Sequence, residues 1–180
     1  MEDITRQIER AFAARAHPGE ENITRCGYDK KNGGEYDGPC GECQRMTDFF
    51  RGKAWRELSA RDLRTRGDAD SLFTVEAYCY YLPVYLIAAV RDRKTLDVCV
   101  DHLTYRFGPK TEDAHGQDRL SAVFGALSDI ELHAILQYFR YSHALERDFD
   151  GYCERSISNV ERELSQRPNS AMQPTAKSGG

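Results

Sequence analysis

The chain has 180 residues, of which 40% are hydrophobic and 30% charged, with ten tyrosines and eight phenylalanines. This balance is typical of one folded domain with an aromatic core, and it excludes an intrinsically disordered chain. The formal net charge is −4, and it becomes −6 without Arg167 and Lys177, the only charged residues after Gln166. Such an acidic body lacks the positive surface that non-specific nucleic-acid binding requires, so no nucleic-acid partner is expected.

The sequence favours a cytoplasmic protein with no membrane partner. Met1-Glu2-Asp3 places acidic residues where a signal peptide would need basic ones. The most apolar stretch, Ala77 to Val90, is too short for a membrane span and is predicted to be a buried core helix. Six cysteines in a chain without an export signal are expected to be reduced thiols.

The first predicted element is an amphipathic helix near the N-terminus. Ile4, Ile8 and Phe12 recur at four-residue spacing, and His17-Pro18-Gly19 follows as a stop signal. The polar stretch from Glu20 to Pro39 is rich in turn residues, and a long irregular loop is predicted there. Irregular segments of this length are usually functional, metal-bound or mobile.

Three helix starts are predicted in the middle of the chain. A short helix from Cys43 should end at Gly52, and the apolar face continues to Trp55, which we expect in the core. Ser59, with Asp62 three residues later, resembles the start of a second helix. Thr74 is a suitable N-cap for the apolar run that follows it.

The last third of the chain contains the clearest helix signal. The helix marked by Leu96 to Leu103 should end at Gly108-Pro109, and a polar loop is predicted from Lys110 to Asp118. Ser128 and Glu131 form a complete capping box at the start of the next helix, in which Leu136 is expected to be a core residue. Residues 157–164 define one final helix.

These elements predict a mainly α fold, a compact irregular bundle of about six helices with a long loop in its N-terminal half. No sustained strand pattern and no repeat is found. Residues 1–165 are expected to form a single helical domain. Residues 166–180 are expected to form a disordered and dispensable tail, because Arg167-Pro168 breaks the helical pattern and little apolar sequence follows.

Four segments of the chain resemble a family of bacterial proteins known only as a domain of unknown function. They are the Cys-x-x-Cys motif at 40–43, residues 52–58, the Tyr-Tyr-Leu-Pro helix at 73–86, and residues 120–139. The resemblance implies a helical fold and a bacterial origin. It implies no catalytic residue, and function has to be argued from the site itself.

The C-terminal segment Met172-Gln173-Pro174-Thr175-Ala176-Lys177 resembles the translated recombination site of an integron gene cassette. Such a peptide is a trace of gene mobility and has no packing role. Proteins carried on cassettes are typically small accessory factors for resistance, modification or toxin neutralisation, and this context is an association rather than a physical argument.

Cys40 and Cys43 are the strongest chemical signal, because two thiolates at this spacing can hold one metal ion, and Cys26 is a candidate third ligand. Candidates for a fourth ligand lie at no characteristic spacing, and they are His17, His102 and Cys79. The default expectation is that these cysteines are loop thiols without metal and that the protein has no cofactor. The alternatives are a structural zinc site and a redox dithiol.

Two surfaces are candidates for function. Tyr78, Tyr80, Tyr81 and Tyr85 offer large rings with polar tips. Core packing accounts for most of them, and the functional alternative is that they form a partner surface. The leading hypothesis is a noncatalytic interaction factor of the immunity or regulatory type, which binds a basic protein through this segment and its acidic helices. The alternative is a small enzyme whose site joins His133, Glu131 and the Cys40 loop.

Overall fold

A computed structural model describes residues 3–25, 41–66, 69–96, 98–110, 112–145 and 151–168. Within these ranges the chain is helical, without strands, which confirms the predicted mainly α fold. The elements in chain order are α1 (Ile4–Ala11), η1 (Glu20–Asn22), α2 (Gly41–Phe50), η3 (Trp55–Glu57), α3 (Ala60–Arg64), α4 (Ala69–Leu72), α5 (Val75–Arg91), α6 (Arg93–Leu96), α7 (Val98–Phe107), α8 (Ala114–Ala126), α9 (Asp129–Leu145) and α10 (Tyr152–Gln166).

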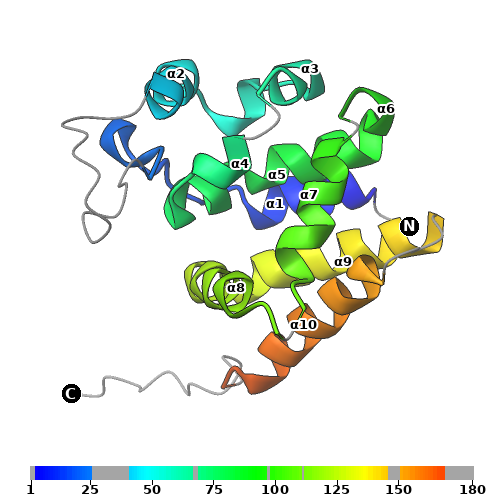
Figure 1. The fold of residues 1–180 in the computed structure, drawn as a ribbon. Coiled ribbons are helices and arrows are strands. Elements are labelled where there is room, and N and C mark those ends of the chain that lie inside the picture. The colour runs from blue at the N-terminus through cyan, green and yellow to red at the C-terminus, as the bar shows by residue number, and fades with distance from the viewer. Residues whose placement is uncertain are drawn as a thin grey trace, which may run out of the picture.

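Helix α5 lies at the centre of the molecule. It contacts α1, α3, α6, α7, α8 and α9. Figure 1 shows α8, α9 and α10 together on one side of the molecule and α2, α3 and α4 on the other. Every residue of α5 from Ala77 to Ala89 is buried, as predicted for the uncharged run. A helix that is apolar all round can only be stable with neighbours on all sides, and the arrangement supplies them.

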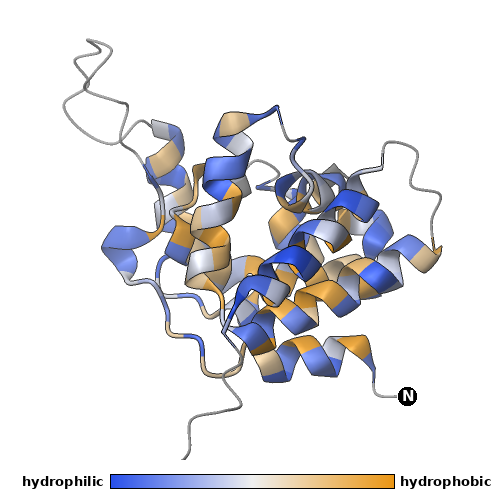
Figure 2. Cartoon of the chain, turned by 90° about the horizontal axis from the view of Figure 1, so that it is seen from below, coloured by the Kyte–Doolittle hydropathy of each residue, from blue (hydrophilic) through white to orange (hydrophobic). Residues whose placement is uncertain are grey.

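The outer helices are amphipathic, and Figure 2 shows hydrophilic and hydrophobic residues alternating along them. Ile8 and Phe12 at α1, and Leu132 and Phe139 in α9, are buried, while Arg10 in α1 and His133 and Gln137 in α9 are exposed. Trp55 is also buried, which confirms its predicted place in the core. No helix in the described part of the chain combines the length and the apolar character needed to cross a membrane.

Side-chain caps fix the helix starts that the sequence indicated. The Ser59 hydroxyl accepts a hydrogen bond from the Asp62 amide, and the Asp62 carboxylate accepts one from the Ser59 amide at 2.8 Å. The Thr74 hydroxyl accepts from the amide of Ala77 at 3.0 Å. Both predicted helix starts are confirmed, because these side chains satisfy amides that have no partner within the helix.

The number of helices differs from the prediction of about six. Part of the difference comes from the short helices α3, α4 and α6. The larger error concerns α8, because most of the predicted polar loop from Lys110 to Asp118 belongs to it. Asp113 caps this helix by accepting from the Gly116 amide at 2.9 Å. Its apolar residues begin only at Leu120, so its first turns read as a loop.

Polar side chains of α10 satisfy the end of α7. The Asn159 side-chain amide donates to the Phe107 carbonyl at 2.9 Å, and the Ser156 hydroxyl lies 2.9 Å from the Thr104 carbonyl. Both side chains are buried. A Cβ atom at Gly108 would lie 3.0 Å from the Ser156 hydroxyl oxygen, so glycine allows the two helices to approach.

The long predicted loop lies mostly outside the described residues, which stop at Arg25 and resume at Gly41. Its first part forms the 3-10 turn η1. The chain is then fastened to the start of α5 by an antiparallel bridge between Thr24 and Phe73, with the Arg25 amide donating to the Leu72 carbonyl at 2.8 Å. This bridge places Thr24 and Arg25 beside the end of α4 and the start of α5.

The predicted boundary of the tail is wrong at Arg167. Its guanidinium donates to the carbonyls of Leu127 at 2.8 Å and Phe124 at 2.5 Å, which end helix α8. It also donates to the Asp129 carboxylate, 2.9 Å away at the start of α9. A cation is favourable at the end of a helix, and Arg167 therefore belongs to the domain. Residues 169–180, including the cassette-like peptide, lie outside the described part of the chain.

Candidate functional site

Glu131 was a candidate catalytic residue, and the structure places it in a buried ion pair. The Arg15 guanidinium donates to its two carboxylate oxygens at 2.5 and 2.6 Å, and also to the Ala126 carbonyl at 2.7 Å. The predicted capping box is confirmed, because the Ser128 amide donates to the same carboxylate at 2.8 Å. Burial acts to raise the pKa of Glu131, but the hydrogen bonds from Arg15 and Ser128 outweigh it and hold the pKa below its ordinary value.

His133 does not join Glu131 in a pocket. Its ring is exposed, and Nδ1 donates to the Asp129 carbonyl of its own helix at 2.7 Å. Glu131, two residues earlier, points into the domain toward Arg15. The predicted enzyme site that joins these two side chains is therefore wrong, because residues two apart on a helix face different directions. Cys40, its third member, lies outside the described residues.

The predicted metal site falls largely outside the described chain. Cys26 and Cys40 are not described, and the Cys43 side chain is buried in α2. No group of three or more potential ligands is found among the described residues. The thiol of Cys79, proposed as a fourth ligand, is buried in α5, and burial raises its pKa to about 12. A protonated thiol is a poor zinc ligand, so Cys79 is unsuited to this role. A zinc site formed by Cys26, Cys40 and Cys43 stays a prediction.

The prediction of a tyrosine partner surface is wrong, because all four side chains are buried. Tyr78, Tyr80, Tyr81 and Tyr85 can all be buried on one helix because α5 has neighbours on every side. The Tyr81 hydroxyl lies 3.0 Å from the Phe50 carbonyl and 3.3 Å from His17 Nε2. Burial raises the pKa of Tyr81, which keeps its hydroxyl protonated.

An open groove runs between α1 and α9 on the outside of the domain. Its volume is about 260 Å³, measured as the space open to the centre of a water molecule. It is lined by Gln7, Arg10 and Ala11 from α1 and by Ile130, His133, Ala134 and Gln137 from α9. The lining carries basic and neutral side chains and no acidic one.

Exposed apolar side chains follow the same face of α9 beyond the groove. Ile130 is 70% exposed, Tyr141 39% and Leu145 66%, and they are spaced so that all three share one side of the helix. We call Ile130, Tyr141 and Leu145 the α9 stripe; Ala134 lies on the same side of the helix but is buried, with 6% of its surface exposed. Single exposed apolar residues need no explanation, but a stripe beside a groove is typical of a binding surface.

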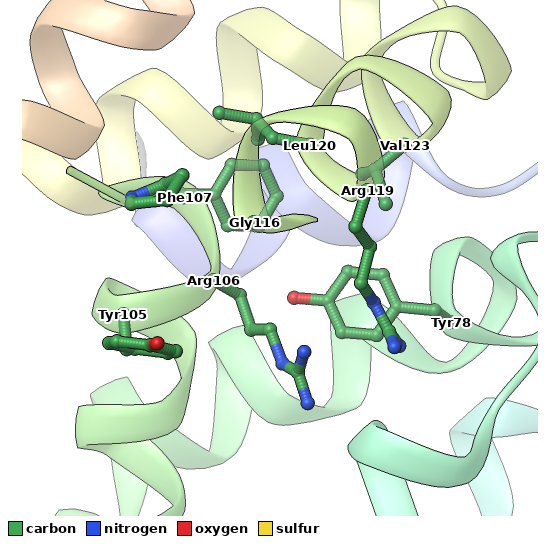
Figure 3. Close-up of a pocket in the computed structure, with 9 residues that line it drawn as sticks. Tyr78, Tyr105, Arg106, Phe107, Gly116, Arg119, Leu120 and Val123 are labelled. Atoms are coloured by element: carbon green, nitrogen blue, oxygen red, sulfur yellow. The ribbon is translucent and has the colours of Figure 1, made fainter. Parts of the chain in front are cut away.

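A second pocket lies between α5, α7 and α8 (Figure 3). Its floor is apolar, formed by Phe107, Pro109, Leu120 and Val123. Its polar wall consists of Tyr78 from α5, Tyr105 and Arg106 from α7, and Arg119 from α8. Figure 3 shows the side chains of Arg106 and Arg119 extending in the same direction past the ring of Tyr78.

The sequence contained a signal for the α9 stripe that was not used. Each residue of an α-helix is rotated by about 100° from the last, so Ile130 lies opposite the inward residues Leu132 and Leu136. An apolar residue opposite a core stripe indicates exposure. No comparable signal existed for Arg106 and Arg119, which lie on different helices and come to line one pocket only in the fold.

The chain belongs to a family of unknown function, DUF6714, whose match spans residues 1–160. This agrees with the resemblance to an uncharacterised family noted in the sequence. The match includes all of α1 to α9 and most of α10, so both the groove and the second pocket lie within the family domain. No curated protein and no solved structure matches the chain.

Proposed function

We propose that this protein is a noncatalytic interaction factor that binds another protein through the α1/α9 groove and the α9 stripe. The observation that carries the proposal is the exposure of Ile130 and Leu145, 70% and 66%, on a helix whose other face is fully packed. Exposed aliphatic side chains beside a groove gain free energy when a partner covers them.

The shape of this surface suits a helix of the partner. Ile130, Tyr141 and Leu145 are separated by 11 and 4 residues, close to whole turns of a helix, so they form a strip along one side that another helix can contact. The 17 residues of α9 give the strip a length of about 25 Å at 1.5 Å per residue. An amphipathic helix could lie along it with its apolar residues in the groove.

The positive charge at the edges of the groove indicates which residues should flank the apolar face of the partner helix. Arg10 and His133 are both exposed at the edges of the groove, and the nearby Arg6 is exposed as well. Acidic residues beside the apolar face of the partner would complement them. The proposed partner is thus apolar and acidic at the contact, which differs from the basic partner expected from net charge.

The groups that a catalytic function would need are engaged in holding helices together. The Glu131 carboxylate is bound by Arg15 and Ser128, and the Tyr81 hydroxyl donates to the backbone carbonyls of Phe50, at the end of α2, and Lys53, just after it. These contacts support a binding role. The proposal includes that the protein is an immunity or regulatory factor, that it is carried on a bacterial gene cassette, and that it acts in the cytoplasm.

Site-specific photocrosslinking tests the proposal in cells that carry the gene naturally. A photoreactive amino acid at Gln137, which lines the groove, is compared with one at Ser121, which is exposed on α8. We expect one partner protein to crosslink from position 137 but not from 121, and Ile130→Glu to abolish that crosslink. Equal crosslinking from both positions, crosslinks only to copies of this chain, or none at all would overturn the proposal.

A further inference from the structure

The two most exposed apolar side chains of the α9 stripe lie symmetrically about the middle of their helix. Ile130 lies seven residues before Gln137, and it is 70% exposed. Leu145 lies seven residues after Tyr138, the residue that follows Gln137, and it is 66% exposed. A second α9 running in the opposite direction would therefore place its Leu145 opposite Ile130 and its Ile130 opposite Leu145. A two-fold interface between identical chains requires a surface that matches itself in this way.

The groove and a projecting ring on this face are related by the same symmetry. Ala134 lies three residues before Gln137, and together with Ala11 of α1 it gives the groove two small side chains, beside which a space of about 260 Å³ stays open. Tyr141 lies three residues after Tyr138, beyond the groove, and is 39% exposed. In the reversed second helix, Tyr141 would come opposite Ala134, where the groove has room for its ring.

The two halves of this face complement each other. The first half of α9 lies beside α1 and carries the groove, whereas Tyr141 and Leu145 in the second half do not line it. A helix that fits the groove has to present one large side chain that enters it and a second one that reaches Ile130. The second half of α9 presents two such side chains, four residues apart on one side of the helix. The chain thus contains a helix that fits its own groove.

Charge favours an antiparallel contact between two such helices. Arg10 lines the groove beside the first half of α9, and Arg6 is exposed one turn earlier on α1. In an antiparallel pair, the basic groups of the two copies lie at opposite ends of the contact, whereas a parallel pair would bring them together. The antiparallel direction also places the positive end of each helix dipole beside the negative end of the other.

We propose that a second copy of this chain covers the groove and the α9 stripe, in an antiparallel α9–α9 contact with its two-fold axis near Gln137. The 17 residues of α9 give the contact a length of about 25 Å, and α1 and α9 side by side give it a width of about 20 Å. The resulting area, roughly 500 Å², is below the ~800 Å² per partner of a standard interface. The association is therefore weak, with half of the chains paired at roughly 0.1 mM.

Pairing would regulate the proposed binding function, and this part of the inference rests on that function. A second copy and a partner helix both need the groove, so each excludes the other. At low concentration the chain is monomeric and its surface is open to the partner, whereas at high concentration a second copy covers it. In photocrosslinking from Gln137, copies of this chain should then appear beside the partner protein.

Sedimentation equilibrium of the full chain, from about 5 µM to about 1 mM, tests the pairing. The average mass of the wild type should rise from that of one chain toward that of two, whereas Ile130→Glu and Leu145→Lys should each stay monomeric. An equimolar mixture of these two variants should associate again, because antiparallel pairing places the introduced charges opposite each other. Ser121→Glu, at an exposed position of α8, is the matched control and should pair like the wild type.

A further variant tests the contact between the ring and the groove. Tyr141→Ala removes the ring that should enter the groove of the other copy, and pairing should require a roughly tenfold higher concentration. Circular dichroism spectra that match the wild type show that each variant is folded, so that a loss of pairing reports on the contact itself.

Disulfide trapping measures the direction of the two helices. Ile130→Cys and Leu145→Cys are each combined with Cys26→Ser and Cys40→Ser, and the two proteins are mixed under oxidising conditions. The four cysteines that remain are buried. We expect the mixed crosslink between positions 130 and 145 to form faster than either crosslink between identical positions, which lie at opposite ends of an antiparallel contact.

A monomer at every concentration up to about 1 mM, no association in the mixture of charged variants, or faster crosslinking between identical positions would overturn the proposal. These measurements use this chain alone, so their failure leaves the proposed function untouched. Crosslinks from Gln137 only to copies of this chain would have the opposite meaning, because they would contradict the proposed function and support the pairing.

Discussion

Helices α5 and α9 have the same length, 17 residues, and both carry aromatic side chains, yet they are used in opposite ways. Helix α5 has no charged residue from Ala77 to Val90 and is buried on every side. Helix α9 buries Leu132, Leu136 and Phe139 but exposes the α9 stripe on its other face. Aromatic residues alone therefore do not indicate a binding surface. An apolar residue opposite an established core face is the better signal.

The two helices are also held in place differently. Helix α5 depends on apolar packing, whereas the start of α9 is fastened by Arg15 and Arg167, each of which also binds carbonyls at the end of α8. Arg15 lies near the N-terminus of the chain and Arg167 near its C-terminus. These polar anchors do not cover the outer face of α9, where Ile130 and Leu145 are exposed.

The largest expected effect comes from breaking the anchor of α9. In Arg15→Met the Glu131 carboxylate, with only 5% of its side chain exposed, would lose its charged partner and keep only the hydrogen bonds from Ser128. Breaking a buried ion pair by removing one member costs roughly 3–5 kcal/mol. Urea denaturation monitored by circular dichroism measures this cost. A change below about 1 kcal/mol would show that the anchor is dispensable and that packing alone holds α9.

The difference between the buried and exposed helix faces predicts a second, slightly smaller effect. Leu86→Ala removes a fully buried side chain of α5, and the cost should be roughly 2–5 kcal/mol because a cavity remains. Leu145→Ala removes the same side chain from the α9 stripe and should change stability by no more than about 0.5 kcal/mol. Similar losses in the two variants would contradict the assignment of the stripe as exposed.

The Glu131 anchor also predicts a dependence on pH. The folded-state pKa lies below the ordinary value of 4.5, so the stabilisation is present above that value. It is lost as the pH falls through the depressed folded-state pKa, where the carboxylate takes up a proton. The free energy of unfolding of the wild type should therefore fall more steeply below pH 4.5 than that of Glu131→Gln. Parallel curves would contradict a charged, depressed Glu131.

Truncation of the C-terminus gives the smallest expected effects. A chain ending at Pro168 keeps Arg167 and should melt at the same temperature as the full chain. A chain ending at Gln166 loses hydrogen bonds to Leu127 and Asp129, at a cost of roughly 1–2 kcal/mol. Equal melting temperatures of the two truncated chains would show that Arg167 contributes nothing, and that the tail begins where the sequence suggested.

The features that the sequence predicted well are those encoded locally. The capping box of Ser128 and Glu131, the cap at Thr74 and the buried run of α5 each depend on residues a few positions apart. Trp55 and Leu136 were also placed correctly, because both are apolar residues on a continuous apolar face.

The features that the sequence did not predict depend on distant residues. Arg15 and Glu131 are 116 residues apart, and Arg167 meets α8 across 40 residues. Helix α8 was missed although Asp113 caps its first turn, because its apolar face begins only at Leu120. The tyrosines of α5 were misplaced because helical periodicity gives the faces of a helix but not how many of them have neighbours.

The central claim is that the α9 stripe serves binding rather than folding, and one paired measurement tests it most directly. The dissociation constant of the partner captured from position 137 is measured for the wild type and Ile130→Glu, alongside their melting temperatures. We predict at least a roughly tenfold loss of affinity, the scale of a central interface residue, with the melting temperature unchanged. An unchanged dissociation constant, or a loss of binding accompanied by unfolding, would contradict the claim.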